Sequence, residues 1–262
     1  MKVIIFCGGR GTRLQEETEY RPKPMVTIGK HPILWHIMKI YSHFSHKDFV
    51  LALGYKGEMI KDYFYNYKWL SSDFTLNIKS KEETYHDHAQ LEDWNITFAD
   101  TGPETKTVKR LSLLKKYLKG EDTFLLTYGD GVADVDINKL VDFHKSKGKI
   151  VTLTGINPTS QYGVIDVDSN YIAQAFKEKP TSEDDFINGG FMVCDKRIFN
   201  YLNEDDPNML EETTLRELAK KGEVAVYHHR GFWQCMDTYR DFFNLNNMWN
   251  NGQRRWAVWE KK

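Results

Sequence analysis

The sequence is poor in cysteine: it has three, Cys7, Cys194 and Cys235, in 262 residues. An odd and sparse set of this kind argues against a disulfide framework and is typical of a reducing compartment. No two of them have the spacing of a cysteine metal site. Cys7 and Cys194 stand inside apolar runs, which favours small buried side chains over reactive thiols.

The sequence also lacks an excess of charge of either sign. It has 36 basic and 37 acidic residues, a formal net charge of -1. A dedicated nucleic-acid-binding protein usually has a basic surface, so this balance argues against that class. Any anionic ligand must be bound by cations placed close to it, because the molecule as a whole provides no attracting field.

Long hydrophobic runs are missing as well. No stretch approaches the roughly 20 apolar residues that a membrane-spanning helix needs. The apolar run within residues 1–6 is too short for a signal peptide. We therefore expect a cytoplasmic protein with neither a membrane nor a nucleic acid as its partner.

The first half of the sequence has an alternation of strand and helix patterns. Residues 3–7, 49–53 and 124–127 are short apolar runs typical of buried strands. Pro32 suits the first position of a helix whose apolar face recurs as far as Phe44. This β-α-β rhythm predicts an α/β fold with a mostly parallel sheet covered by helices on both faces. Such sheets bind ligands at the carboxyl ends of their strands.

The second half is less regular. Further strands are predicted at residues 74–78, 95–99, 150–154, 164–167 and 191–194, and further helices at residues 58–67, 137–144, 210–220 and 238–249. The close spacing of the later strands indicates added antiparallel elements, and the polar segment 79–93 is expected to protrude as a loop. Because no linker or repeat interrupts the chain, we expect one domain over residues 1–262.

A glycine-rich segment, GGRGTRL at residues 8–14, follows the first predicted strand. Glycines let backbone N–H groups wrap an anion because no Cβ blocks the approach, and Arg13 adds a planar cation suited to phosphate. The segment is not a dinucleotide fingerprint, because Leu14 replaces the third glycine, and it is not a P-loop, because no Gly-Lys-Ser/Thr follows. Alone it indicates a phosphate-binding turn, with an ordinary tight turn as the alternative.

Lys23 lies between two prolines, Pro22 and Pro24. The prolines restrict the backbone on both sides, which lowers the entropy lost when the ammonium binds a phosphate. The alternative is a solvated surface lysine.

Carboxylates stand at two further positions with chemical potential. Asp130 follows the predicted strand 124–127, where a parallel sheet would hold a metal ligand, although turn aspartates have the same pattern. Asp237 precedes the last predicted helix, where a helix cap is the alternative.

Two late segments offer groups for a sugar and a second phosphate. Glu178 and Lys179 precede a proline, and Asn188 and Gly189 begin a glycine-containing turn before a strand. A solvated charge is the alternative for Lys179.

Together these motifs resemble the sugar-1-phosphate nucleotidyltransferase family. Its signature is a GxGTRL loop, a lysine between prolines, a strand-end aspartate, an EKP element and a late aspartate, and all occur here in that order. Within the family the chain is most similar to the glucose-1-phosphate cytidylyltransferases, through segments such as PILWHIMKIY at 32–41 and GYKG at 54–57. The resemblance implies a Rossmann-like fold of the nucleotide-diphospho-sugar transferase type. Residues 1–140 would form the nucleotide-binding part and residues 141–262 the sugar-phosphate part.

The resemblance also implies the reaction and the residues that perform it. CTP and α-D-glucose 1-phosphate would give CDP-glucose and pyrophosphate, with Mg²⁺ as cofactor, in a homo-oligomer such as a hexamer. The nucleotide would be bound by Gly8, Gly9, Gly11, Thr12, Arg13, Lys23, Arg110 and Gly129. The sugar phosphate would be bound by Tyr128, Gly163, Glu178, Lys179, Asn188 and Gly189. Asp130 and Asp237 would bind the metal, and Arg13, Lys23 and Asp130 would be catalytic.

Two departures leave the substrates open. Residues 107–110 read TVKR where the cytidylyltransferases usually have TGGR, so Val108 and Lys109 would add bulk next to the base. Residues 210–215 depart from the usual WExEPL stretch, which bears on the sugar. UTP, dTTP or another phosphorylated acceptor is therefore an alternative.

Two other functions remain as hypotheses. A glycosyltransferase that consumes a nucleotide sugar could use Asp134 and Asp136 as its metal motif. A non-catalytic nucleotide sensor could have the same fold, but it would not need Lys23, Asp130 and Asp237, all of which are present.

Overall fold

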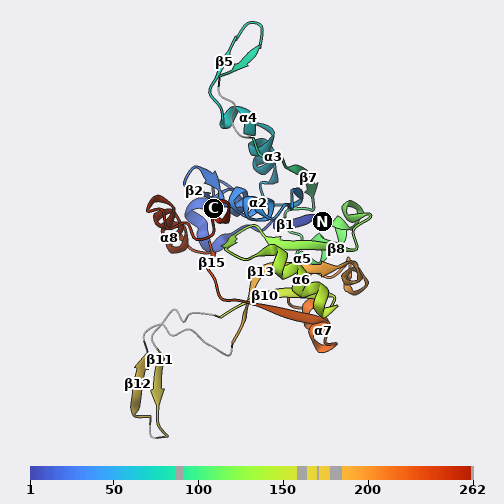
Figure 1. Cartoon of the computed structure of the whole chain (residues 1–262), viewed down its shortest axis with the longest axis vertical. Coiled ribbons are helices and arrows are strands. Elements are labelled where there is room, and N and C mark those ends of the chain that lie inside the picture. The colour runs from blue at the N-terminus through green and yellow to red at the C-terminus, as the bar shows by residue number, and fades with distance from the viewer. Residues whose placement is uncertain (87–90, 158–163, 170, 178–184, 261–262) are drawn as a thin grey trace.

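The computed structural model describes residues 1–260 except 87–90, 158–163, 170 and 178–184 (Figure 1). Its centre is a sheet of seven strands in the order β14-β10-β13-β8-β1-β4-β7. In that order the strands are Val224–His229, Val151–Ile156, Ile187–Asp195, Thr123–Tyr128, Val3–Cys7, Asp48–Leu53 and Asn95–Asp100. Among the described strands of this sheet, β13 pairs antiparallel with β8 and β10, and the other neighbours pair parallel. The predicted α/β class with a mostly parallel sheet is confirmed.

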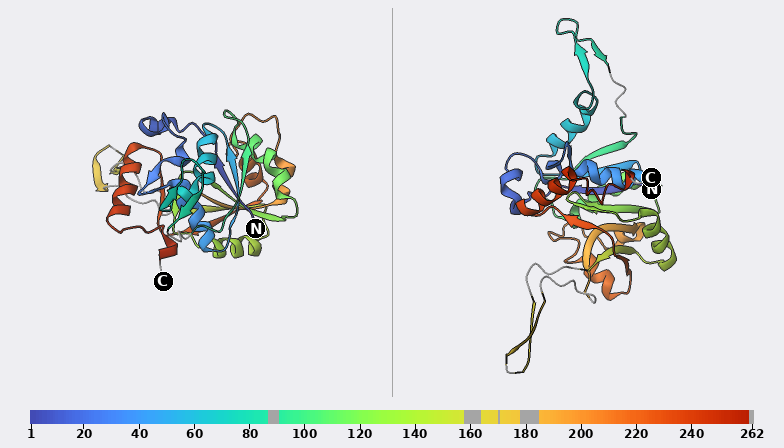
Figure 2. Two further views of the ribbon diagram at one scale, coloured as in Figure 1. Left: turned by 90° about the horizontal axis from the view of Figure 1, so that it is seen from above. Right: turned by 60° about the vertical axis from the view of Figure 1, so that its left-hand side comes forward.

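Helices cover both faces of this sheet (Figure 2, left). Side chains alternate along β1, so Val3 and Ile5 belong to one apolar cluster and Ile4 and Phe6 to the other. The first cluster includes residues of α2 (Ile33–His43), α6 (Ile137–Lys147) and α8 (Tyr239–Asn250), and the second includes residues of α5 (Thr107–Leu114) and α7 (Thr214–Lys220). Cys7 and Cys194 are buried free cysteines, as predicted.

Shorter elements connect and extend this body. The short helices are α1 (Gln15–Thr18), α3 (Gly57–Tyr65) and α4 (Tyr67–Leu70), and the 3₁₀ helices are Thr12–Leu14, Lys23–Met25, Lys115–Leu118, Lys196–Tyr201 and Val258–Glu260. Two small antiparallel pairs are β2 (Thr27–Ile28) with β3 (His31–Pro32), and β9 (Gly131–Ala133) with β15 (Trp233–Cys235). Among the helices of the described ranges, none is long and apolar enough to span a membrane.

Two hairpins project from opposite ends of the molecule (Figures 1 and 2). One pairs β5 (Phe74–Leu76) with β6 (Glu83–Tyr85), and the other pairs β11 (Val164–Val167) with β12 (Ala173–Lys177). Residues 79–86 of the segment predicted as a protruding loop therefore protrude as expected, but the prediction of a loop was partly wrong because they include β6.

Several predicted boundaries differ from the structure. Pro32 is the N-cap of α2 rather than its first residue, with extended backbone at ψ 153°. The helix predicted from residue 210 begins at Thr214, because the backbone N–H of Leu210 donates to Thr107 Oγ1 (2.6 Å) and residues 210–213 form turns. Helix α5 and strands β12 and β14 were not predicted.

Candidate active site

The glycine-rich loop lies at the carboxyl edge of the central sheet. It follows β1, and β1 is flanked by the parallel strands β8 and β4. The loop therefore lies beside the segment after β8, which contains Asp130, and beside Gly54, which follows β4. The ends of three parallel strands meet here, as the sequence pattern predicted.

Glycines allow the chain to pass closely at this edge. A Cβ on Gly54 would lie 2.7 Å from Gly8 Cα, and a Cβ on Gly129 would lie 2.9 Å from the carbonyl oxygen of Phe6. Gly11 has a φ of 64°, in the left-handed region that other residues rarely adopt. By contrast, a Cβ on Gly9 would contact nothing within 4 Å. Gly9 is thus free to face a ligand, whereas Gly8 and Gly54 are required by packing.

Arg110 links the chain segments that surround the glycine-rich loop through hydrogen bonds to their backbone. Its buried guanidinium donates to the carbonyl oxygens of Leu53 (2.8 Å), Gly102 (3.2 Å) and Thr105 (2.6 Å). A Cβ on Gly8 would lie 2.1 Å from this guanidinium. Arg110 lines the larger cavity described below, and several of its donors bind the backbone of the loops that form this cavity.

Val108 does not crowd the cavity, contrary to the expectation. Residues 107–114 form α5, which turns Val108 into the apolar core, where it is fully buried. Lys109 is exposed, and neither residue is among those that line the cavity. The first turn of the helix, through Thr107, is what reaches the site.

Lys23 joins two carboxylates at the centre of the site. Its Nζ lies 2.6 Å from Asp130 Oδ2 and 2.5 Å from Asp237 Oδ1. The backbone at Pro22 is extended, and Pro24 is buried, so the lysine leaves a fixed stretch of chain. Arg13 adds a second cation, with a guanidinium nitrogen 3.1 Å from Asp237 Oδ1.

Asp237 reaches Asp130 through pairing of distant segments. In the β9–β15 pair Cys235 lies opposite Gly131, and the backbone N–H of Met236 donates to the carbonyl oxygen of Asp130 (2.8 Å). The next residue, Thr238, caps α8 in a capping box with Asp241. Asp237 is therefore held between a strand and a helix start, and the helix-cap alternative is wrong for Asp237 because Thr238 is the cap.

Lys23 and Asp237 are kept in their ionised forms by the charged groups around them. Burial alone would lower the pKa of Lys23, but the carboxylates of Asp130 and Asp237 outweigh it and raise the pKa of Lys23 above its ordinary value. Burial alone would raise the pKa of Asp237, but the hydrogen bond from Lys23 and the charges of Lys23 and Arg13 lower it. Lys23 and Asp237 are thus charged at neutral pH.

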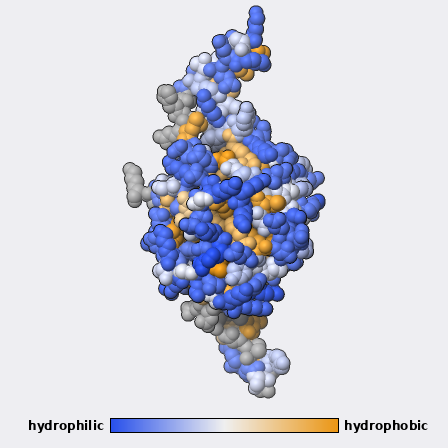
Figure 3. All heavy atoms as spheres, turned by 90° about the vertical axis from the view of Figure 1, so that its right-hand side faces the viewer, coloured by the Kyte–Doolittle hydropathy of each residue, from blue (hydrophilic) through white to orange (hydrophobic). Residues whose placement is uncertain are grey.

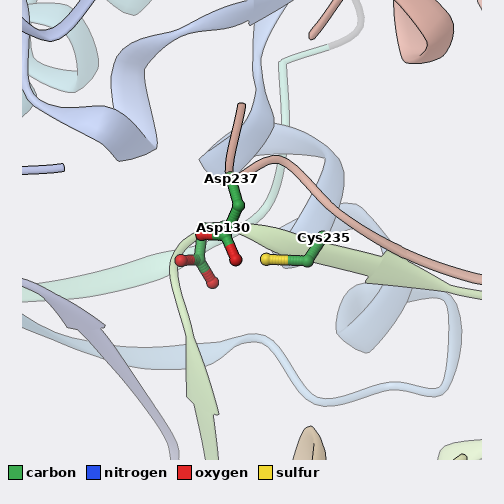
Figure 4. Close-up of side chains that lie close together, drawn as sticks. All are labelled: Asp130, Cys235 and Asp237. Atoms are coloured by element: carbon green, nitrogen blue, oxygen red, sulfur yellow. The ribbon is translucent and has the colours of Figure 1, made fainter. Parts of the chain in front are cut away.

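The carboxylates also fit a divalent metal ion. Ligand atoms of Asp130, Asp237 and Cys235 lie within 4.8 Å of one another, and their side chains point toward a common space (Figure 4). Carboxylate oxygens are the ligands that Mg²⁺ prefers. The thiol of Cys235 is a softer donor and was not predicted as part of the site.

Two cavities meet at this cluster. The larger, of about 540 Å³, is lined by the glycine-rich loop, Lys23, Arg110 and residues 103–107. The smaller, of about 240 Å³, is lined by Asn188, Gly189 and Trp233, among others. Arg13, Tyr128, Asp130 and Asp237 line both. The arrangement can hold two ligands with their anionic ends at a shared boundary.

The smaller cavity is shaped by the first residues of β13. Asn188 Oδ1 accepts from the N–H of Gly190 (2.9 Å), and the carbonyl oxygen of Gly189 accepts from Trp233 Nε1 (2.8 Å). Tyr128 packs against Gly190, where a Cβ would lie 3.0 Å from the ring. Asn188 and Gly189 are therefore held at the lining of the cavity by hydrogen bonds.

Most of the predicted site residues come together here. Lining one or both cavities are Gly8, Gly9, Gly11, Thr12, Arg13, Lys23, Arg110, Tyr128, Gly129, Asp130, Asn188, Gly189 and Asp237. Gly163, Glu178 and Lys179 lie outside the described residues. Trp233 and Cys235 were missed, although their place just before Asp237 in the sequence was a signal.

Comparison with known proteins decides the family. The family model described as nucleotidyl transferase matches residues 2–251. The chain belongs to this family. The membership predicted from the motifs is confirmed, and the protein is an enzyme of the nucleotidyltransferase class.

Relatives of this nucleotidyltransferase agree along the whole chain. It is 48% identical over 259 residues to a Bacillus subtilis (strain 168) protein named probable glucose-1-phosphate cytidylyltransferase, with 99% of this chain and 100% of that one covered. It is 45% identical over 260 residues to glucose-1-phosphate cytidylyltransferase of Salmonella typhi, with the same coverage. The solved structure of HddC from Yersinia pseudotuberculosis with GMP-PN has a TM-score of 0.65 at 22% identity, over 94% of this chain and 98% of that one, and supports the fold.

The aspartates of the glycosyltransferase hypothesis serve the fold. Asp134 Oδ1 accepts from the N–H of Phe232 (2.6 Å). Asp136 is the N-cap of α6 and accepts from the N–H of Lys139 (3.0 Å). The family match and these contacts speak against that hypothesis.

Proposed function

We propose that the protein condenses CTP with α-D-glucose 1-phosphate to give CDP-glucose and pyrophosphate. The observation that carries the proposal is the group of Arg13, Lys23, Asp130 and Asp237 at the boundary of two cavities. A reaction between two anions needs cations and a metal site at such a boundary. The names of relatives with 45–48% identity support the choice of substrates.

The larger cavity suits the nucleoside triphosphate. Backbone N–H groups of the glycine-rich loop would bind its phosphates, because the loop is open at Gly9, where a Cβ would meet nothing within 4 Å. The side of the cavity formed by residues 103–107 would contact the nucleoside. Since Val108 points into the core, the loss of glycines at 108–109 leaves room for a cytosine base.

The smaller cavity suits the sugar phosphate. Tyr128, Asn188 and Gly189 would bind the sugar, and Glu178, Lys179 and Gly163 are proposed to complete that part from the sequence motifs alone. The phosphate would then face Arg13, which lines both cavities.

The reaction is an in-line attack of a sugar-phosphate oxygen on the α-phosphorus of CTP, which breaks the bond to pyrophosphate. No protein nucleophile is required, so catalysis consists of positioning and charge stabilisation. Arg13 and Lys23 would bind the phosphates and stabilise the negative charge that develops on the leaving group.

The proposed cofactor is Mg²⁺ on Asp130 and Asp237. When bound, it would neutralise phosphate charge and orient the α-phosphate. Asp237 is held for this role by the β9–β15 pairing and the start of α8.

We also propose that the enzyme is a homo-oligomer. Large apolar side chains are exposed on both projecting hairpins, including Ile78 (71%) on one and Ile172 (60%) and Phe176 (65%) on the other. Orange spheres mark apolar residues on both projections in Figure 3. Exposed apolar side chains on long projections are typical of contacts with another chain, and further copies of the same protein are the proposed partners.

Pyrophosphate release with a panel of substrates tests the assignment. CTP, UTP, dTTP and GTP should each be offered with glucose 1-phosphate, mannose 1-phosphate and galactose 1-phosphate. We expect CTP with glucose 1-phosphate to give the highest kcat/KM. Exclusive use of UTP or dTTP would overturn the cytidylyl assignment, and no release at catalytic amounts of enzyme with any pair would favour the nucleotide-sensor hypothesis.

A further inference from the structure

The ammonium of Lys23 occupies the space between the two proposed metal ligands. Its Nζ lies 2.6 Å from Asp130 Oδ2 and 2.5 Å from Asp237 Oδ1. Nζ thus contacts one oxygen of each carboxylate, and carboxylate oxygens are also the ligands that Mg²⁺ prefers. A metal ion held by these same two oxygens would compete with the ammonium of Lys23 for them.

The charges of the site also disfavour a metal ion while Lys23 contacts both carboxylates. The two carboxylates carry two negative charges, and Lys23 and Arg13 carry two positive charges at salt-bridge distance. The Lys23 side chain is only 11% exposed, so water screens it weakly and an added divalent ion would be repelled. A nucleoside triphosphate supplies the negative charge that could accept Lys23 in place of the carboxylates.

The ammonium of Lys23 can reach a second position, in the proposed phosphate cavity. Lys23 also lines the larger cavity, in which the phosphates would lie. Its backbone is fixed between Pro22 and Pro24, whereas its side chain has four rotatable bonds. Rotation of the side chain alone can thus move the ammonium from the carboxylates toward a phosphate.

We propose that Lys23 and the divalent metal ion are alternative occupants of the Asp130–Asp237 pair. Free metal ion then binds weakly, and the nucleotide promotes metal binding by drawing Lys23 onto its phosphates. By thermodynamic reciprocity the metal promotes nucleotide binding to the same extent. This inference rests on the proposed metal site at Asp130 and Asp237.

Binding of Mn²⁺ to the enzyme without nucleotide tests the proposal. Free Mn²⁺ is followed by electron paramagnetic resonance, for the wild type, Lys23→Met and Lys23→Gln. We expect both variants to bind one Mn²⁺ at least about tenfold more tightly than the wild type, since a competing cation has been removed. Two neutral replacements are used so that a folding defect in one does not decide the outcome, and circular dichroism checks both.

Lys39→Met is the matched control. Lys39 also forms a part-buried ion pair, with Nζ 2.7 Å from both carboxylate oxygens of Glu92, on the outer side of α2. Its loss should leave Mn²⁺ affinity at the wild-type value. An equal gain in this variant would overturn the proposal, because the effect would then be one of general charge.

Asp130→Asn separates the proposal from the site on which it rests. Added to Lys23→Met, it should abolish the tight Mn²⁺ site. If wild type and Lys23→Met bind Mn²⁺ equally and both lose it with Asp130→Asn, the metal site stands and the exclusion by Lys23 is wrong. If no variant, with or without CTP, shows Mn²⁺ binding that depends on Asp130, the metal site itself is wrong.

Discussion

At the scale of single residues, Lys23 forms ion pairs with two other charged groups of the site. It lines the proposed phosphate cavity and bridges Asp130 and Asp237. We expect Lys23→Ala to lower kcat for pyrophosphate release by roughly 10²–10³, the usual cost of losing one transition-state donor. Steady-state kinetics with CTP and glucose 1-phosphate measure it.

The control for this variant is again Lys39→Met, which should retain wild-type turnover. Lys23→Ala must also unfold cooperatively, as followed by circular dichroism. A folded Lys23→Ala enzyme with near-normal kcat would remove Lys23 from the mechanism.

His36 predicts a dependence of stability on pH. It is fully buried on α2, its Nε2 hydrogen bonds to the carbonyl oxygen of Ile28 (3.0 Å), and burial lowers its pKa from 6.5 to about 3. The unfolded chain therefore binds a proton between pH 6.5 and about 3 that the folded protein does not. The stabilisation is complete above pH 6.5 and falls by up to about 1.4 kcal/mol per pH unit below it.

Urea unfolding at several pH values measures this effect. His36→Gln, which keeps a donor for Ile28, should flatten the dependence between pH 6.5 and 5. His43→Gln, at an exposed histidine of the same helix, should leave it unchanged. Parallel curves for wild type and His36→Gln would contradict the assignment.

The sequence predicted single residues well where a residue type stood beside a clear local feature. Lys23 lies between two prolines, Asp130 follows a predicted strand and Asp237 precedes a predicted helix, and the structure brings the three into contact. Arg110 was predicted to bind nucleotide, but its bonds to three loop carbonyls could not be read from the sequence. Such contacts depend on where distant loops meet.

At the scale of elements, two neighbouring glycines of the glycine-rich loop have different roles: Gly8 is required by packing, and Gly9 is proposed to face the ligand. Gly8→Ala would bring a Cβ to 2.1 Å from the buried Arg110 guanidinium, whereas Gly9→Ala has open space. We expect Gly8→Ala to lose about 1–3 kcal/mol of unfolding free energy, the usual cost of overpacking. Gly9→Ala should keep wild-type stability and raise KM for the nucleotide, since the new methyl group faces the phosphates.

Thermal unfolding measures the stability of the two variants, and steady-state kinetics measure their KM for the nucleotide. Equal stability of both would show that Arg110 yields to a Cβ. A Gly9→Ala enzyme with unchanged KM would show that the phosphates do not approach this residue.

Helices and strands could be predicted from the sequence where their apolar residues recur with a clear helix or strand periodicity. The strands β1, β4 and β8 and the helices α2 and α6 lie within one to three residues of their predicted limits. Helix α5 was missed because residues 107–110 were compared with a glycine-containing loop. Strand β14 was missed because it is an edge strand with exposed polar positions, such as His228, and its burial depends on β10.

At the scale of the whole molecule, the two projections predict assembly. We expect light scattering after size exclusion to give a mass that is a multiple of the 30.8 kDa chain. Ile172→Glu with Phe176→Glu should shift the mass to a smaller species, because charges replace exposed apolar contacts. Lys145→Glu, at an exposed position on α6, is the control and should not change it.

The order and direction of the strands from the second half of the chain could not be predicted. The alternation of strands and helices predicts parallel neighbours, but β13 is inserted between β8 and β10 in the opposite direction. Which strand fills that place depends on long-range packing that no local pattern records. A monomeric wild-type protein would contradict the predicted assembly while leaving this fold unchanged.

The pairing of β15 with β9 completes the active site late in synthesis of the chain. Asp237 is synthesised long after Asp130, and it reaches its partner only when β15 adds to β9. A growing chain on the ribosome contains the residues of β1, β4 and β8 with their loop well before the second carboxylate exists. We therefore expect no turnover before synthesis has passed residue 237, and none from a chain that terminates before it.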